Sequence, residues 1–202
     1  MTRGWYSLRT VPPAVSPVSV SDLVAGVRDR KRGVATFRDD VAALLGAEHV
    51  ATYGSVRQAI CACLLEVQRA DDRGRTAVVV PAFSSRDFAA AIEDVGLTVR
   101  YCDLEPETLA VDPASLDTID GDDVLALVAV NLLGFGSRMD ELVAFCRRVD
   151  CALVEVLGYS LGTAYQGRHL GRFGDCALLN FQEGKPIPVG GGMVTSNDPD
   201  LV

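Results

Sequence analysis

Lysine is scarce in this chain of 202 residues. The nineteen basic residues include only two lysines, Lys31 and Lys185, and the others are all arginine. The 27 acidic residues outnumber the basic ones and give a net charge of -8. Binding of nucleic acid needs a clustered basic face, so this charge balance disfavours nucleic acid as a partner. A lysine next to a strand end is more notable here than in a lysine-rich chain.

Long apolar runs are missing as well. The longest, over 124–130, is far shorter than the roughly 20 residues that cross a bilayer. Prolines and serines interrupt every apolar stretch of residues 1–20, which therefore do not resemble a signal peptide. We expect a cytoplasmic protein without membrane contact.

The six cysteines form no C-x-x-C pair, which argues against a zinc site and against a dithiol redox motif. All of them lie within apolar segments, so we expect buried free thiols and no metal site. They are Cys61, Cys63, Cys102, Cys146, Cys151 and Cys176.

From residue 49 onward, short β-rich segments alternate with amphipathic helical ones. Hydrophobic residues make up 49% of the chain, enough for one sizeable core. Parallel strands that are buried on both faces have continuous apolar sequences. The alternation predicts an α/β fold of three layers, a mostly parallel sheet with crossover helices. The expected strands are 49–53, 76–80, 97–104, 124–130, 151–156, 176–181 and 191–196.

Residues 1–48 have a different pattern and are predicted to form an N-terminal arm and helices. The arm covers about residues 1–20, and helices are expected over 22–30, capped by Ser21, and over 37–45. Residues 49–202 form the predicted large domain. Asp198 and Pro199 look like the start of a helix that is not completed, so we expect the chain to be truncated.

Ligands of parallel sheets bind beyond the carboxyl ends of the strands. After the strand over 49–53, Gly54, Ser55 and Val56 open a helix whose free N–H groups and hydroxyl suit a phosphate. A simpler interpretation is that Gly54 ends the strand and Ser55 only caps the helix. Both interpretations stay open on the sequence.

Lys185 follows the strand over 176–181 and is flanked by Gly184 and Pro186, with Gly190 to Gly192 beyond. A lysine in this position is well placed to form a Schiff base with a carbonyl compound. The alternative is a solvated loop lysine. The glycines do not form a G-x-G-x-x-G fingerprint, so a nucleotide-binding Rossmann-like protein is the weakest reading.

Several stretches together resemble the DegT/StrS family of pyridoxal-phosphate-dependent sugar aminotransferases, from about residue 49 to the end. The resemblance implies the N-terminal large-domain portion of a fold type I transferase, without its smaller C-terminal domain. It also implies a dimer whose active site borrows residues from the neighbouring chain. The matching stretches are 53–55, 80–83, 102–109, 111–113, 131–134, 162–168, 171–175 and the Lys185 loop with its glycines.

The resemblance also assigns site residues. It implies that Lys185 is the Schiff-base lysine and that Gly54, Ser55 and Val56 hold the cofactor phosphate. Asn180 stands where the family usually has a phosphate-binding serine, and its amide NH2 can still donate a hydrogen bond.

Three positions depart from the family pattern. Val156 replaces the aspartate that pairs with the pyridine nitrogen of pyridoxal phosphate, which weakens the cofactor as an electron sink. Glu155 cannot substitute, because adjacent side chains of a strand point to opposite faces. Ser85 replaces the aromatic residue that stacks on the ring, and Tyr159 stands in place of a glutamine.

Two functional hypotheses follow. The first is a pyridoxal-phosphate-dependent aminotransferase that moves an amino group from an amino acid, expected to be glutamate, to a nucleotide-linked keto sugar. The second is a catalytically impaired or truncated paralogue with a structural or regulatory role. The expected protein partner is a second chain, in a homodimer or in a heterodimer with an intact relative.

Overall fold

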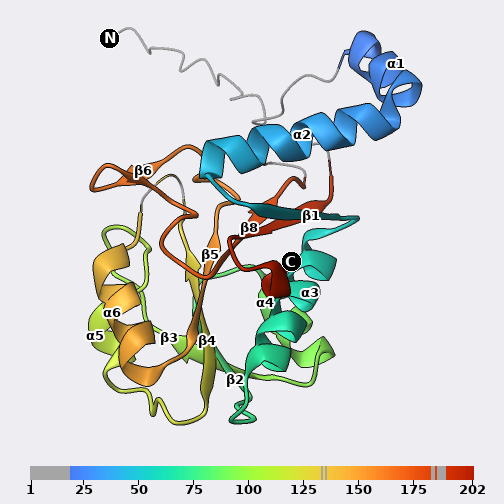
Figure 1. The fold of residues 1–202 in the computed structure, drawn as a ribbon. Helices are drawn as coiled ribbons and strands as arrows, with labels where there is room; N and C mark the ends of the chain where they lie inside the picture. The colour runs from blue at the N-terminus through green and yellow to red at the C-terminus, as the bar shows by residue number, and fades with distance from the viewer. Residues whose placement is uncertain (1–18, 133, 135, 183–184, 186–189) are drawn as a thin grey trace, which may run out of the picture.

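A seven-stranded sheet runs through the middle of the computed structural model, which describes residues 19–132, 134, 136–182, 185 and 190–202 (Figure 1). The strand order is β1-β9-β8-β5-β4-β2-β3. All neighbours from β8 to β3 are parallel, while β9 is antiparallel to both β8 and β1. The predicted mostly parallel sheet is confirmed. The strands are β1 (His49–Tyr53), β2 (Ala77–Pro81), β3 (Thr98–Cys102), β4 (Val124–Val130), β5 (Ala152–Val156), β8 (Cys176–Asn180) and β9 (Gly192–Ser196).

Helices cover both faces of the sheet and complete the three layers. In Figure 1, α3 and α4 lie on one side of the sheet, and α5 and α6 lie on the other. Two two-residue strands, β6 (Ala164–Tyr165) and β7 (Arg168–His169), form a separate hairpin that the sequence did not predict. The helices are α1 (Val20–Arg28), α2 (Arg30–Leu45), α3 (Val56–Ala70), α4 (Arg86–Asp94), α5 (Pro113–Leu116), α6 (Met139–Val149) and the 3-10 turn η1 (Pro199–Leu201).

Each face of the sheet has its own hydrophobic core. Every residue of β2 and β4 is buried, which explains the continuous apolar sequences of these strands. Because side chains alternate along a strand, Leu153 packs in the core beside α6, while Val154 packs in the core beside α3. The two faces therefore present different side chains at the ends of the same strands.

The N-terminal helices begin earlier than the sequence predicted. The first starts at Val20 and is capped by Ser19, because Ser19 and Asp22 form a reciprocal capping box. The expected cap Ser21 therefore lies inside this helix. The second helix starts at Arg30 rather than at residue 37, and most of the expected N-terminal arm lies outside the described residues.

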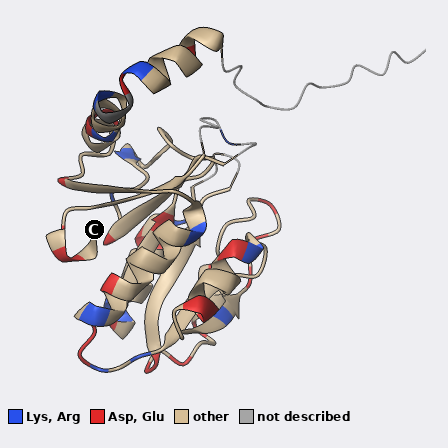
Figure 2. Ribbon diagram, turned by 90° about the vertical axis from the view of Figure 1, so that its right-hand side faces the viewer, with Lys and Arg blue, Asp and Glu red and all other residues tan. Residues whose placement is uncertain are grey.

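Charged side chains are mixed over the surface on the α3 and α4 side (Figure 2). Both basic and acidic positions occur on these helices, and no single basic face stands out in this view. None of the described helices is long and apolar enough to cross a membrane.

Candidate active site

A cavity of about 380 Å³ opens at the carboxyl ends of the parallel strands. Val130, Val156 and Asn180 are the last residues of β4, β5 and β8, and all three line it. This is the position at which open α/β sheets bind their ligands. The other lining residues are Val56, Ile60, Phe83, Ser84, Ser85, Asp87, Phe88, Asn131, Leu132, Gly158, Tyr159 and Lys185.

Lys185 lies within this cavity, beside the loop that follows β5. Its Nζ is 3.5 Å from the ring centre of Tyr159, a close cation–π contact. A Cβ atom added to Gly158 would lie 3.6 Å from Lys185 Nζ and 3.4 Å from Asn180 Cβ. Lys185, Tyr159 and Asn180, which were singled out on the sequence, therefore share one site. Residues 183–184 and 186–189 of the lysine loop lie outside the described residues.

The turn before α3 has the capping geometry that its sequence predicted. Ser55 is the N-cap, and its Oγ accepts a hydrogen bond of 3.2 Å from the backbone N–H of Gln58. Among the described residues, the hydroxyl proton of Ser55 and the first two N–H groups of the helix have no acceptor, so they can donate to a ligand. Val56 is buried and lines the cavity, whereas Gly54 and Ser55 lie beside it and do not line it. The role of this turn in phosphate binding stays a prediction.

Gly192 explains part of the glycine triplet after Lys185. A Cβ atom at this position would lie 2.8 Å from Val56 Cα and 3.0 Å from both Ser55 O and Ala59 Cβ. Only a residue without a side chain allows β9 to pass this close to the start of α3. The glycine therefore fixes the turn at Ser55 next to the sheet.

Two amides stand at the strand ends. Asn180 accepts a hydrogen bond of 2.9 Å from the backbone N–H of Gln182 through its side-chain oxygen. Asn131 accepts one of 2.9 Å from the backbone N–H of Ser137, but its buried Nδ2 has no hydrogen-bond partner among the described residues. Buried donors are nearly always paired, so this amide marks a position where a ligand or a water can bind.

Val156 and Glu155 lie as expected on opposite faces of β5. Val156 belongs to the core beside α3 and lines the Lys185 cavity. Glu155 is fully buried on the other face, where its carboxylate accepts hydrogen bonds from the N–H groups of Gly171, Phe173 and Gly174 at 2.6 to 2.7 Å. Burial away from water raises the pKa of Glu155, against the effect of these backbone donors. Glu155 therefore anchors a loop and does not reach the cavity.

Ser85 reaches the cavity as the N-cap of α4, with its Oγ donating to Asp87 Oδ2 at 3.2 Å. The sequence did not single out Phe83 as a site residue, although it also lines the cavity and is 62% exposed. The available signal was an aromatic residue two positions after Pro81, where β2 ends, since ligands bind beyond the carboxyl ends of parallel strands. Of the lining residues that the structure describes, Asp87 is the one acid.

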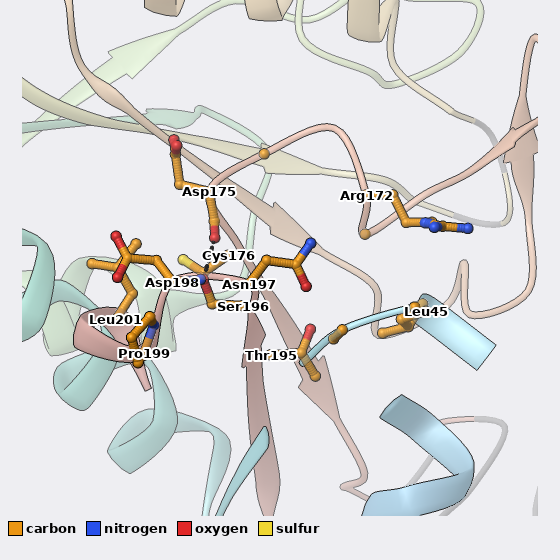
Figure 3. Close-up of a pocket in the computed structure, with 14 residues that line it drawn as sticks. Leu45, Arg172, Asp175, Cys176, Thr195, Ser196, Asn197, Asp198, Pro199 and Leu201 are labelled. Carbon is orange, nitrogen blue, oxygen red and sulfur yellow. Dashed lines mark hydrogen bonds between the residues drawn. The ribbon is translucent and has the colours of Figure 1, made fainter. Parts of the chain in front are cut away.

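A larger cavity, of about 510 Å³, lies at the opposite edge of the sheet (Figure 3). Cys176 at the start of β8 and Ser196 at the end of β9 line this cavity, and Arg172 lies on its far side. No lysine lines it. We assign the candidate active site to the smaller cavity because the strand ends and Lys185 meet there. Among the described residues, no group of three or more His, Cys, Asp or Glu side chains could hold a metal ion.

Comparison with known proteins identifies the family. The model of the DegT/DnrJ/EryC1/StrS aminotransferase family matches residues 25–202, and the chain belongs to this family. The resemblance seen in the sequence is therefore confirmed.

Individual relatives agree with this assignment. GDP-perosamine synthase of Caulobacter vibrioides is 33% identical over 125 residues, which are 61% of this chain and 34% of that protein. The spore coat polysaccharide biosynthesis protein SpsC of Bacillus subtilis is 27% identical over 198 residues, 97% of this chain and 50% of that protein. The chain thus spans half or less of the length of these relatives.

Solved structures share the fold. The aminotransferase PseC of Helicobacter pylori superimposes with a TM-score of 0.82 at 20% identity, covering 92% of this chain and 52% of that one. DesI, solved in the presence of its TDP-sugar product, gives a TM-score of 0.77 at 25% identity, covering 89% of this chain and 46% of that one. At 20% identity, the similarity to PseC shows that the two proteins share a fold.

Proposed function

We propose that this chain is the large-domain part of a pyridoxal-phosphate-dependent aminotransferase in which Lys185 binds the cofactor aldehyde covalently. The observation that carries the proposal is the position of Lys185. Its Nζ contacts the Tyr159 ring in a cavity that Val56 and Asn180 also line, at the carboxyl ends of the strands. Membership of an aminotransferase family supports it.

The cavity fits pyridoxal phosphate in most respects. Its volume of about 380 Å³ lies in the usual range of small-ligand sites, roughly 300–1,000 Å³. The side chains of Val56, Val130 and Val156 give it apolar walls that suit an aromatic ring. The amide of Asn131, which has no partner within the described part of the chain, can donate to a polar group of the ligand.

One feature of the cavity does not fit. The pyridine nitrogen needs a carboxylate to stay protonated, and Val156 occupies the position that the family resemblance assigns to it. Asp87, which also lines the cavity, lies at the start of α4 and accepts a hydrogen bond from Ser85. With Val156 at the position assigned by the resemblance, the ring nitrogen would lack its usual carboxylate partner.

When bound, the cofactor supplies an electron sink for bonds at the α-carbon of an amino acid. The chain's own residues would bind and orient it. The Ser55 hydroxyl, the first N–H groups of α3 and the Asn180 amide would hold the phosphate. The Nζ of Lys185, which lies in the cavity, is the group that would carry the proton to and from the substrate.

We further propose a nucleotide-linked keto sugar as the amino acceptor, in sugar biosynthesis. GDP-perosamine synthase and DesI, with its TDP-sugar product, support this class of substrate. We expected glutamate as the amino donor, but one relative is an L-glutamine:2-deoxy-scyllo-inosose aminotransferase of Streptomyces lividus. Amino transfer to the cofactor should be measured with glutamate and with glutamine. The readout is the loss of the visible absorption of the cofactor.

The partner is proposed to be a second chain, either a copy of this one or an intact relative. The described part of α1 exposes four apolar side chains on one face, Val20, Leu23, Val24 and Val27, which are 56% to 86% exposed. Contiguous exposed apolar residues of this kind are typical of interaction surfaces.

Free thiols suit a reducing compartment, so we propose that the protein acts in the cytoplasm.

Val156 favours a second candidate function. Without a carboxylate at the ring nitrogen, a relative that binds the cofactor but transfers amino groups slowly could serve a structural or regulatory role. The two functions share Lys185 and differ in the rate of amino transfer.

The deciding experiment is a titration of the purified protein with pyridoxal phosphate, followed by its visible absorption. The absorption band of a lysine-bound cofactor is expected in the wild type and in Lys31→Ala, which replaces the only other lysine of the sequence. It should be absent in Lys185→Ala. Equal bands in both lysine variants, or none in the wild type, would refute the proposal.

A further inference from the structure

Two cysteines far apart in the sequence meet in the core of the protein. Cys63 lies on α3 and Cys176 is the first residue of β8, 113 residues later. Their Sγ atoms are 2.9 Å apart, and both side chains are buried. An S–S bond is about 2.05 Å long, so the two sulfurs need to approach by only about 0.9 Å to bond. No function proposed for the Lys185 cavity uses this pair.

The pair is reachable from the larger cavity at the opposite edge of the sheet. Cys176 is one of the residues that line this space of about 510 Å³ (Figure 3). Asp175 and Ser196 lie beside it, joined by a hydrogen bond of 2.7 Å from Ser196 Oγ to the carbonyl oxygen of Asp175. A cavity of this volume is large enough for a molecule of hydrogen peroxide.

We propose that Cys63 and Cys176 form a reversible disulfide when a small peroxide enters the cavity. Peroxide first oxidises one thiolate to a sulfenic acid, and the second thiol then displaces water from it to form the S–S bond. Both sulfurs lose one electron, the two thiol hydrogens leave in water, and one hydrogen peroxide is reduced to two water molecules. A dithiol reverses the reaction by thiol–disulfide exchange.

The reaction is slow at neutral pH and speeds up as the pH rises. The hydrogen bond with Cys63, followed by burial, raises the pKa of Cys176 well above its ordinary value. Thiolates are the reactive form, so little of the pair reacts while the solution is neutral. The rate of cross-linking is therefore expected to rise with pH up to the point where the protein unfolds.

The cross-link would join two elements that border the candidate active site. The helix α3 begins at Val56, which lines the Lys185 cavity, and β8 ends at Asn180, which lines it as well. A covalent bond between them restricts the unfolded chain over a long loop. The oxidised protein should therefore unfold at a higher temperature than the reduced one.

The test is peptide mapping of the purified chain after treatment with hydrogen peroxide at the highest pH at which circular dichroism shows the protein folded, in a Cys61→Ser background. This background removes the half-buried thiol, whose Sγ lies 3.6 Å from the Ala91 carbonyl oxygen. The expected result is a protein that has lost the mass of two hydrogens and yields a linked peptide pair containing Cys63 and Cys176. Dithiothreitol should restore the original mass.

Two results would overturn the proposal. One is a folded, peroxide-treated protein in which Cys63 and Cys176 remain as thiols or are recovered as sulfinic acids without a link. The other is an unchanged loss of two hydrogens in Cys63→Ser, which would assign the link to another pair. Circular dichroism shows whether Cys63→Ser is folded. If it is not, the peptide mapping of the protein that keeps both cysteines still tests the proposal. Because the readout does not involve pyridoxal phosphate, its outcome is independent of the proposed function.

Discussion

Glu155 and Val156 are consecutive residues of β5 whose side chains lie on opposite faces of the sheet. Glu155 holds the loop over 171–174 through three backbone hydrogen bonds, whereas Val156 forms part of the wall of the Lys185 cavity. Two consecutive residues therefore have different roles: Glu155 has a structural one, and Val156 has one in the chemistry of the cavity. Each role leads to a different prediction.

Glu155→Gln should destabilise the protein. A glutamine has only one oxygen, so at least one of the three N–H groups that Glu155 accepts would lose its acceptor. An unpaired buried donor costs about 1–3 kcal/mol of unfolding free energy. Urea unfolding measures the change. The exposed Glu93→Gln is the matched control and should change stability by less than about 0.5 kcal/mol.

The effect of Glu155→Gln should also depend on pH. Burial raises the pKa of Glu155 in the folded protein above the ordinary value of about 4.3. Between the two values the folded state binds more protons than the unfolded chain, so this group adds stability as the pH falls. The wild type gains this stability and the variant does not. The difference between them should widen from pH 7 toward pH 4.3, and a constant difference would contradict the assigned pKa shift.

Val156→Asp should tighten the binding of pyridoxal phosphate. A carboxylate at this position can accept a charge-assisted hydrogen bond from a protonated ring nitrogen, worth about 1.5–3 kcal/mol, or roughly tenfold to a hundredfold in affinity. Without the cofactor the buried charge lowers stability. Adding the cofactor should therefore raise the unfolding temperature of Val156→Asp more than that of the wild type.

Val156→Asn is the control for this change, since it has the same shape without the charge. It should bind the cofactor no more tightly than the wild type. Equal affinities for all three proteins would mean that the ring nitrogen does not lie beside residue 156.

Substitutions of Ser55 separate its capping role from phosphate binding. Ser55→Ala should lower stability by about 1 kcal/mol through loss of the helix cap. Ser55→Asp keeps a good cap but places a negative charge beside the phosphate, which should weaken cofactor binding tenfold or more. Pyridoxal without its phosphate should bind Ser55→Asp and the wild type alike. Unchanged binding of the phosphorylated cofactor to Ser55→Asp would remove this turn from the site.

Gly192→Ala should disturb the same turn from the side of the sheet. Its new Cβ would lie 2.8 Å from the backbone of Val56, so β9 and α3 must move apart. Overpacking of this kind costs about 1–3 kcal/mol. Gly33→Ala has open space around its Cβ and should leave stability unchanged or raise it. Both effects can be read from denaturant midpoints.

The layered fold was predictable because buried parallel strands have continuous apolar sequences. Every residue of β4 is buried, and its sequence showed this directly. Helix starts were less predictable, since Ser19 and Ser21 are both good caps and only the backbone geometry selects Ser19. The β6–β7 hairpin was missed because two-residue strands show no periodicity.

The site was predictable where it follows from strand ends. Lys185, Tyr159 and Asn180 meet because the carboxyl ends of β5 and β8 lie at one edge of the sheet. Asp87 was not predictable, since the direction of a side chain in the first turn of a helix depends on the preceding loop. The contact between Cys63 and Cys176 joins distant segments and has no local sequence signal.

The most direct test of the central claim is borohydride reduction of the protein mixed with pyridoxal phosphate, followed by peptide mapping. We predict a stable pyridoxyl group on Lys185, with none on Lys31, the other lysine of the chain. Modification of both lysines to the same extent, or of neither, would contradict the assignment of Lys185 as the cofactor-binding residue.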